Sequence, residues 1–220
     1  MNKKPKEMPV YLFTGFLESG KTKFIQETLE DKRFCNKEKT LLLVCEEGEE
    51  EYAPEQFATD TVVIRVLEGQ EQLTTENLTK WAQETKADRV VIEYNGMWLL
   101  DALYAAMPEG WVVYQEFMFA DAGTFLSYNG NMRQLVYDKL KSCELVVFNR
   151  FKPDMDKMEF HKVVRAASRR AERARSPRPL WQARSARDAR KDAQRRPRRQ
   201  AARRARQLSP RRSPRFGAPL

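Results

Sequence analysis

The stretch GFLESGKT, residues 15–22, matches the pattern GxxxxGK[ST] at every fixed position. It lies between an apolar run, PVYLFT at 9–14, and a stretch with helical spacing, KFIQETLEDKRF at 23–34. A glycine-containing turn between a strand and a helix presents backbone N–H groups and the positive end of the helix dipole to an anion. This context predicts a phosphate-binding P-loop. The alternative is a turn that binds nothing.

The fixed residues of this stretch have distinct expected roles. Gly15 and Gly20 let the backbone bend around phosphate oxygens. Lys21 is expected to reach the β and γ phosphates and to act in catalysis, and the Thr22 hydroxyl to ligate Mg²⁺. The motif therefore predicts binding of a nucleoside triphosphate with magnesium.

Apolar, β-branched runs alternate with helical patterns along most of the chain. Such alternation predicts an α/β fold, here a mostly parallel P-loop NTPase sheet with helices on both faces. Ligands of such sheets bind at the carboxyl ends of the strands. The expected strands are 9–14, 40–46, 61–67, 89–94, 111–120 and 144–149, and the expected later helices are 74–86, 98–107, 122–142 and 156–172.

Charge divides the chain into two unlike parts. Residues 161–220 carry a net charge of +18 and residues 1–160 a net charge of −9. Residues 173–220 contain sixteen Arg, one Lys and only two aromatic residues, which is too little apolar surface to offset the entropy of ordering. We therefore expect a P-loop domain over 1–172 and a disordered Arg-rich tail over 173–220. The abrupt change in residue usage suggests that the tail arises from a shifted reading frame.

Cysteine use and hydropathy indicate the compartment. The three cysteines, Cys35, Cys45 and Cys143, form no CxxC pair, and an odd number gives no disulfide framework. The first residues lack the apolar core of a signal peptide, and no apolar run approaches the ~20 residues that span a bilayer. We expect a cytoplasmic protein with no membrane partner.

A second candidate site follows the strand at 89–94, where the chain reads Glu93-Tyr94-Asn95-Gly96. A carboxylate at the end of a buried strand beside a P-loop is suited to orient Mg²⁺ through water, so Glu93 is expected in a metal and catalytic role. Gly96 leaves its amide free to approach a γ-phosphate. The alternative for Glu93 is a helix-capping or turn-forming acid.

Two further loops follow strands. The acidic loop 46–51 lies where P-loop GTPases place a switch that senses γ-phosphate and metal, although most charge runs are only a solvated face. Asn149 and Arg150 lie where guanine-specific GTPases have an NKxD loop. Asn149 is the expected base contact. Lys152 occupies the Asp position and Asp154 follows two residues later, so ATP stays an alternative to GTP.

Taken together, these motifs resemble the CobW-type GTPases. Their signature TGFLGSGKTTLL matches residues 14–22 except for Glu18, and Lys23 stands where Thr is usual. The family's ExxG motif matches 93–96. Residues 45–49, CEEGE, lie where the family often shows NEFGE, and residues 120–122, ADA, resemble its VDA. The resemblance gives Glu49 a candidate metal role. It implies Mg·GTP binding by Gly15, Glu18, Ser19, Gly20, Lys21, Thr22, Lys23, Gly96 and Asn149, with Thr22, Glu49 and Glu93 at the metal.

Two departures from the family narrow the function. The CxCC motif suited to transition metals is missing, because the only cysteines between the P-loop and ExxG, Cys35 and Cys45, are separated by nine residues, and His161 is the sole histidine. The family's carboxyl-terminal β-rich domain is replaced by the Arg-rich segment. The resemblance thus implies an isolated or truncated GTPase domain.

The function expected from sequence is a GTP-binding protein that hydrolyses GTP slowly and acts on a client protein. One alternative is non-specific binding of nucleic acid through the tail, because clustered arginines release counterions from phosphate backbones. The other is a small-molecule kinase. A lid rich in arginine is typical of such kinases, whereas the arginines of residues 1–140 are spread over Arg33, Arg65, Arg89 and Arg133.

Overall fold

The computed structural model describes residues 7–35, 38–46, 48–167 and 172–174. All of these belong to one unit of the chain, Met1–Trp181, and the second unit, Gln182–Leu220, lies outside them. The predicted disordered tail therefore falls outside the described residues, apart from 173–174.

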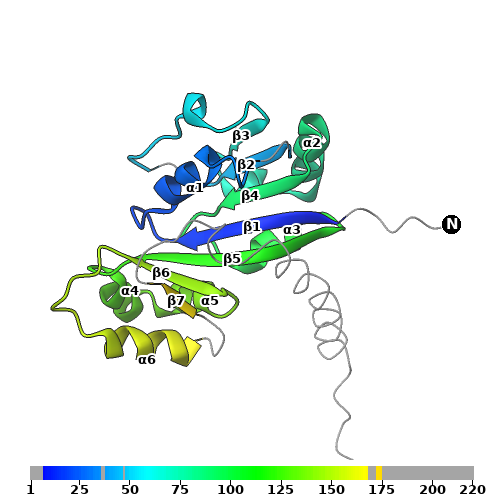
Figure 1. Cartoon of the computed structure of the whole chain (residues 1–220). Coiled ribbons are helices and arrows are strands. Elements are labelled where there is room, and N and C mark those ends of the chain that lie inside the picture. The colour runs from blue at the N-terminus through cyan, green and yellow to red at the C-terminus, as the bar shows by residue number, and fades with distance from the viewer. Residues whose placement is uncertain (1–6, 36–37, 47, 168–171, 175–220) are drawn as a thin grey trace, which may run out of the picture. The chain divides into compact units, whose positions relative to one another are not determined.

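The described residues build a parallel seven-stranded sheet in the order β3-β2-β4-β1-β5-β6-β7 (Figure 1). Every strand pair is parallel, as the alternating pattern predicted. The strands are β1 (Met8–Gly15), β2 (Thr40–Val44), β3 (Val62–Val66), β4 (Arg89–Glu93), β5 (Trp111–Asp121), β6 (Leu145–Asn149) and β7 (Glu172–Ala174).

Helices cover both faces of this sheet because its strands carry apolar side chains on both faces. On one face Leu12 and Ile92 pack with residues of α2 (Thr75–Thr85) and α3 (Leu100–Ala106). On the other, Phe13 and Val91 pack with Phe24 and Ile25 of α1 (Lys21–Glu30). The remaining helices, α4 (Phe125–Asn131), α5 (Arg133–Leu140) and α6 (Lys157–Ala167), share a cluster with β5 and β6. Two short 3₁₀ turns, η1 (Pro54–Gln56) and η2 (Gln70–Gln72), complete the elements.

Two helix predictions are wrong in extent. The helix expected over 122–142 is broken at Met132, whose φ of −129° and ψ of 44° are not helical. The preceding sequence Asn129-Gly130-Asn131 explains the break, because Gly and Asn are poor helix formers. The helix expected over 156–172 is described as α6 over Lys157–Ala167, and it cannot extend to Glu172, which begins β7 beside β6. The helix expected over 74–86 is capped at its start by Thr74, whose side chain accepts a hydrogen bond from Asn77 N.

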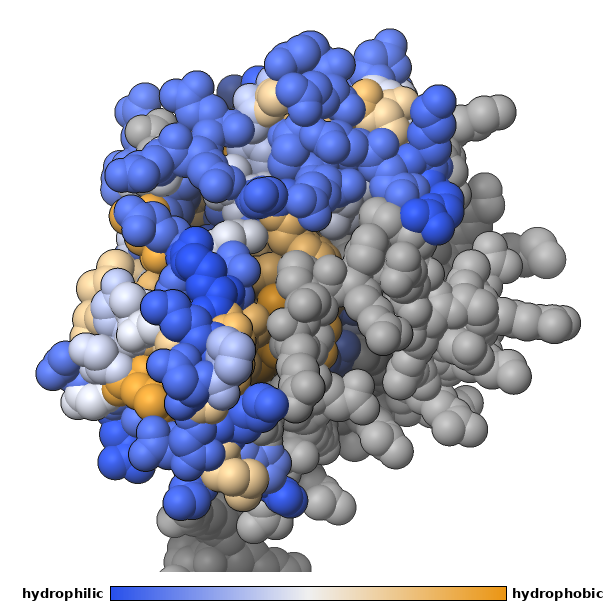
Figure 2. Space-filling view, turned by 60° about the vertical axis from the view of Figure 1, so that its left-hand side comes forward, coloured by the Kyte–Doolittle hydropathy of each residue, from blue (hydrophilic) through white to orange (hydrophobic). Residues whose placement is uncertain are grey.

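On the face shown in Figure 2 the described residues are mostly hydrophilic, with apolar areas between the hydrophilic ones. Among the large apolar side chains that are exposed, Leu17 belongs to the P-loop and Met97 to the loop after β4. No helix in the described ranges combines the length and apolar character needed to cross a bilayer.

Candidate nucleotide-binding site

The loop between β1 and α1 has the backbone of a phosphate cradle. Gly15 and Gly20 have φ of +138° and +90°, a region that disfavours any side chain. A Cβ on Gly15 would lie 2.1 Å from the Phe119 carbonyl oxygen, and one on Gly20 would lie 2.5 Å from Asn149 Nδ2. The loop is therefore packed tightly between the ends of β5 and β6, with the amino end of α1 beside it (Figure 1).

Glu18 also has a positive φ, of 56°. A residue with a Cβ costs about 1–2 kcal/mol in this left-handed region, and this is the position at which the sequence has Glu in place of the usual Gly. The unusual residue is thus a strained one.

Replacing Glu18 with Gly is expected to stabilise the protein by about 0.5–1 kcal/mol, because relief of strain exceeds the added entropy of the unfolded chain. Urea unfolding measures the change. Lys86→Gly is the matched control, because Lys86 has a φ of 52° at the end of α2, away from the site. A loss of stability in Glu18→Gly alone would contradict strain and indicate a structural role of the Glu18 side chain.

Lys21 begins α1 and its side chain is 3% exposed. Its Nζ donates to the carbonyl oxygens of Gly15 at 3.1 Å and Phe16 at 2.9 Å. It also donates to Glu46 Oε2 at 2.6 Å. The predicted lysine is therefore fixed over the loop, with one carboxylate against it.

Glu46, which follows β2, makes a second contact across the site. Its Oε1 accepts a hydrogen bond from Gly96 N at 3.2 Å. The two predicted groups Lys21 and Gly96 are thus brought together, and Glu46 joins them. Sequence reasoning placed Glu46 in the acidic loop but did not single it out, because the five glutamates of that loop offered no distinction in its favour.

Glu93 ends β4, is 2% exposed and lies beside the start of α1. Its Oε1 accepts from Thr22 Oγ1 at 2.7 Å, and its Oε2 accepts from the Tyr52 hydroxyl. Burial raises the pKa of Glu93, while the bonds from Tyr52 and the charge of Lys21 oppose that rise. Burial also raises the pKa of Tyr52, which therefore stays a donor. Tyr52 went unnoticed in the sequence; its only signal was an aromatic residue directly after an acidic run.

Hydrogen bonds with two residues of α5 fix the loop after β4. The Tyr94 hydroxyl donates to Leu99 O at 2.8 Å, and Leu100 N donates to Asp138 Oδ2 at 2.9 Å. The fully buried Lys139 donates to Trp98 O. Gly96 itself packs on the P-loop so closely that a Cβ would lie 2.6 Å from Gly15 O.

The predicted base-reading loop also touches the P-loop. Arg150, which stands in the Lys position of NKxD, donates from its guanidinium to Asp121 Oδ2 and to Glu18 O. Arg150 thereby links the VDA and P-loop segments. Lys152 and Asp154 are exposed, and within the described part of the chain neither side chain bonds to the P-loop. The role of Asn149 at a base stays a prediction, although its amide lies against Gly20.

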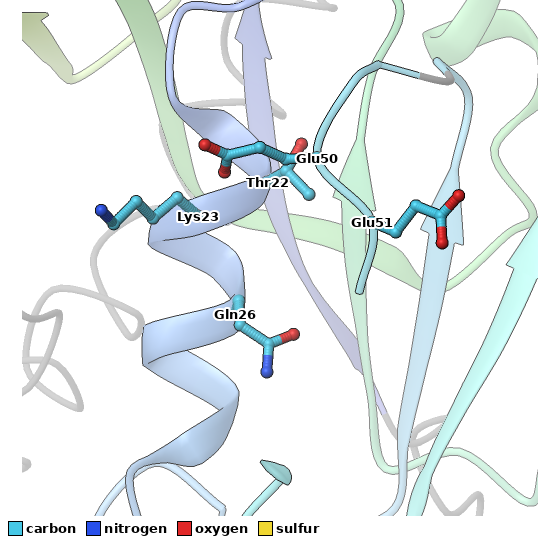
Figure 3. Close-up of a pocket in the computed structure, with 5 residues that line it drawn as sticks. All are labelled: Thr22, Lys23, Gln26, Glu50 and Glu51. Carbon is cyan, nitrogen blue, oxygen red and sulfur yellow. The ribbon is translucent and has the colours of Figure 1, made fainter. Parts of the chain in front are cut away.

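An open cavity of about 290 Å³ adjoins the amino end of α1. Thr22, Lys23 and Gln26 line it from α1, and Glu50 and Glu51 line it from the facing segment (Figure 3). Glu49 is exposed, and within the described ranges no hydrogen bond brings it to Thr22 or Glu93. Its metal role therefore stays a prediction.

The donor set fits a phosphate with magnesium. The Ser19 Oγ is buried and has no hydrogen-bond partner within the described part of the chain, which is an unusual cost unless a ligand supplies the partner. Thr22 and Glu93 offer the hard oxygens that Mg²⁺ prefers, and Mg²⁺ takes its other ligands from phosphates and water. Among the described residues no group of three or more His, Cys, Asp or Glu is arranged for a metal.

Thiolate chemistry at this site is disfavoured. Cys45 is buried beside Glu93 and Glu46, and burial raises the pKa of its thiol to about 12. The thiol is therefore protonated and a weak nucleophile at neutral pH.

Comparison with known proteins places the chain. Residues 9–179 match the model of the CobW/HypB/UreG nucleotide-binding domain. A search of curated proteins gave no match. The fold is similar to that of the Zn(II)-bound YjiA GTPase from E. coli, with a TM-score of 0.56 and 15% identity over 77% of this chain and 57% of that one. It is also similar to the hydrogenase maturation factor HypB from Archaeoglobus fulgidus, with a TM-score of 0.53 and 14% identity over 76% of this chain and 79% of that one. The chain thus spans less than two thirds of YjiA.

Proposed function

Because the chain belongs to the CobW/HypB/UreG nucleotide-binding family, we propose that it binds Mg·GTP at the 15–22 loop and hydrolyses it slowly. The observation that carries the proposal is the convergence of Lys21, Thr22, Glu93 and Gly96 around one point, with the unpartnered Ser19 hydroxyl beside it. Lys21 neutralises phosphate charge, and the amides of the loop and of Gly96 bind phosphate oxygens. Thr22 and Glu93 would hold the metal, which would withdraw charge from the same oxygens.

Slow turnover follows from the placement of arginine. An arginine aimed at the γ-phosphate accelerates such reactions by roughly 10³–10⁵. Arg150 approaches the P-loop, but Asp121 and the Glu18 carbonyl hold its guanidinium at the end of β5 and β6. We therefore expect rapid turnover only with an added partner, such as a client protein that supplies a cation.

Guanine preference rests on Asn149 at the end of β6, beside Gly20. The three described cysteines are free and buried, which suits the reducing cytoplasm. We place the protein there, as a nucleotide-dependent partner of a client.

A competition titration tests this function. A fluorescent GTP analogue is bound to the full chain in millimolar Mg²⁺ and displaced with GTP or ATP, and phosphate release is followed in parallel. We expect micromolar binding, stronger displacement by GTP, turnover well below one per second and at least tenfold weaker binding after chelation of Mg²⁺. Failure of both nucleotides to bind would overturn the proposal, and stronger displacement by ATP would overturn its guanine preference.

A further inference from the structure

Glu46 bridges two separate loops of the candidate site. One carboxylate oxygen lies 2.6 Å from Lys21 Nζ and the other 3.2 Å from Gly96 N. The side chain is only 10% exposed, so the bridge is shielded from water, and the ion pair is stronger than one on an open surface. Both oxygens of a single anionic group are engaged.

The two donors that hold Glu46 are those that a P-loop site directs at a terminal phosphate. Its lysine reaches the β and γ phosphates. The amide of the glycine after the Glu93 strand faces the same point, because Gly96 packs against Gly15 and Phe16 of the P-loop. A backbone amide has a single hydrogen, so Gly96 N cannot serve a carboxylate and a phosphoryl oxygen together.

We propose that Glu46 is an internal competitor of the γ-phosphate and sets the preference of this site between nucleoside diphosphate and triphosphate. The inference rests on the proposed nucleotide binding but not on the identity of the base. A triphosphate must displace the Glu46 carboxylate from Lys21 and Gly96. A diphosphate has no γ-phosphate, so it leaves the bond from Gly96 N to Glu46 in place.

The chain around Glu46 confines that displacement to a short segment. Cys45 N donates to Glu93 O at 2.9 Å, immediately before Glu46. Tyr52 donates to the Glu93 carboxylate at the far end. Both hydrogen bonds end on Glu93, the last residue of β4. Gly48, Glu49 and Glu50, which lie between the two bonded positions in the sequence, are exposed. The Glu46 side chain can thus move away from Lys21 and Gly96 without breaking the pairing of β2 with β4.

The magnitude follows from the bonds that compete. A charge-assisted hydrogen bond contributes enough free energy to change an equilibrium roughly 10- to 100-fold. Removing the bridge should therefore strengthen triphosphate binding by roughly 10- to 100-fold and diphosphate binding by no more than about threefold. The ratio of the two dissociation constants is the quantity that changes.

Four variants of the full chain separate the bridge from general charge. Glu46→Gln removes the ion pair at constant size, and Glu46→Ala removes both contacts. Glu46→Asp keeps the charge but is too short by one methylene to span both donors. Glu55→Gln makes the same charge change on an exposed residue of η1.

The experiment measures dissociation constants for GDP and GTP, and for ADP and ATP, by calorimetry in excess Mg²⁺. Thermal unfolding first establishes that each variant is folded. We expect the triphosphate-to-diphosphate preference to rise in Glu46→Gln and Glu46→Ala and partly in Glu46→Asp, and to stay unchanged in Glu55→Gln. Two results would show that general charge repulsion, and not the bridge, sets the ratio. One is the same rise in Glu55→Gln, and the other is an unchanged ratio in Glu46→Asp beside a rise in Glu46→Gln.

The failures of the two proposals are distinct. If the unaltered chain binds both nucleotides and the ratio is the same in folded Glu46→Gln and Glu46→Ala, the inference is wrong and the proposed function stands. If the unaltered chain binds neither nucleotide, the proposed function is wrong and the inference falls with it.

Discussion

Replacing Lys21 with alanine should weaken GTP binding by about 100- to 1,000-fold, the largest effect expected of any single change to this protein. Lys21 is 3% exposed and meets two carbonyl oxygens and one carboxylate, so its charge is fixed over the loop. No other described lysine or arginine bonds to those carbonyl oxygens or to the Glu46 carboxylate. Displacement of a fluorescent GTP analogue measures the loss, and binding within threefold of that of the unaltered chain would contradict the assignment.

The variant should also be less stable, and the double variant separates the two effects. Without Lys21, the Glu46 carboxylate is left without its counter-ion, and of the influences that lower the pKa of Glu93 only the hydrogen bonds from Tyr52 and Thr22 remain. Breaking such a pair costs up to about 3–5 kcal/mol. Lys21→Ala with Glu46→Gln should recover part of that stability in urea unfolding, but its GTP affinity should stay far below that of Glu46→Gln alone. Equal GTP affinity in the double variant and in Glu46→Gln would show that folding, not phosphate contact, was lost in Lys21→Ala.

Glu116→Gln should raise the free energy of unfolding above neutral pH, and this is the second largest effect that we expect of a single change. Glu116 is a buried residue of β5 that accepts hydrogen bonds from Tyr104 and Ser142, both at 2.8 Å. Burial raises its pKa from an ordinary 4.5 to about 7. Glutamine has nearly the same shape and can accept from the same hydroxyl groups without carrying a charge.

The direction of the pH effect follows from that raised pKa. The unfolded chain loses the Glu116 proton near 4.5 and the folded protein near 7, so stability is full below about 4.5 and is lost as the pH rises through 7. The loss approaches about 3 kcal/mol at pH 8. Urea unfolding from pH 5 to 8 should show a flatter profile for Glu116→Gln, whereas the exposed Glu109→Gln should keep the original slope. Glu93 leaves a residual slope of the same sign. Equal slopes in Glu116→Gln and the unaltered chain would contradict the assignment.

The sequence was sufficient to predict six of the seven described strands and the main loops of the site, but not β7. Apolar runs such as 40–44 and 89–93 are buried on both sides, and the GxxxxGK[ST] pattern needs its strand and helix. The break at Met132 was missed because three weak helix formers beside apolar residues do not dictate where a helix stops.

Within the site, sequence could predict which loops meet but not which atoms. The carboxyl ends of β1, β2 and β4 are neighbours in the sheet, so the residues that follow them converge. Which acid of the 46–51 run reaches Lys21 depends on the path of the chain after β2, and periodicity ends there. The contacts of Tyr52 and Arg150 likewise join residues more than forty and more than a hundred positions apart.

The close packing of Gly96 on Gly15 has a consequence for protein engineering. A Cβ on Gly96 would lie 2.6 Å from Gly15 O and 2.8 Å from Phe16 Cα, so the two loops meet backbone to backbone. No side chain between them can be trimmed or enlarged to absorb a mismatch. Chimaeras with other members of the family should therefore exchange residues 14–22 and 93–100 together as a single module, and a graft of either loop alone should inherit a backbone clash.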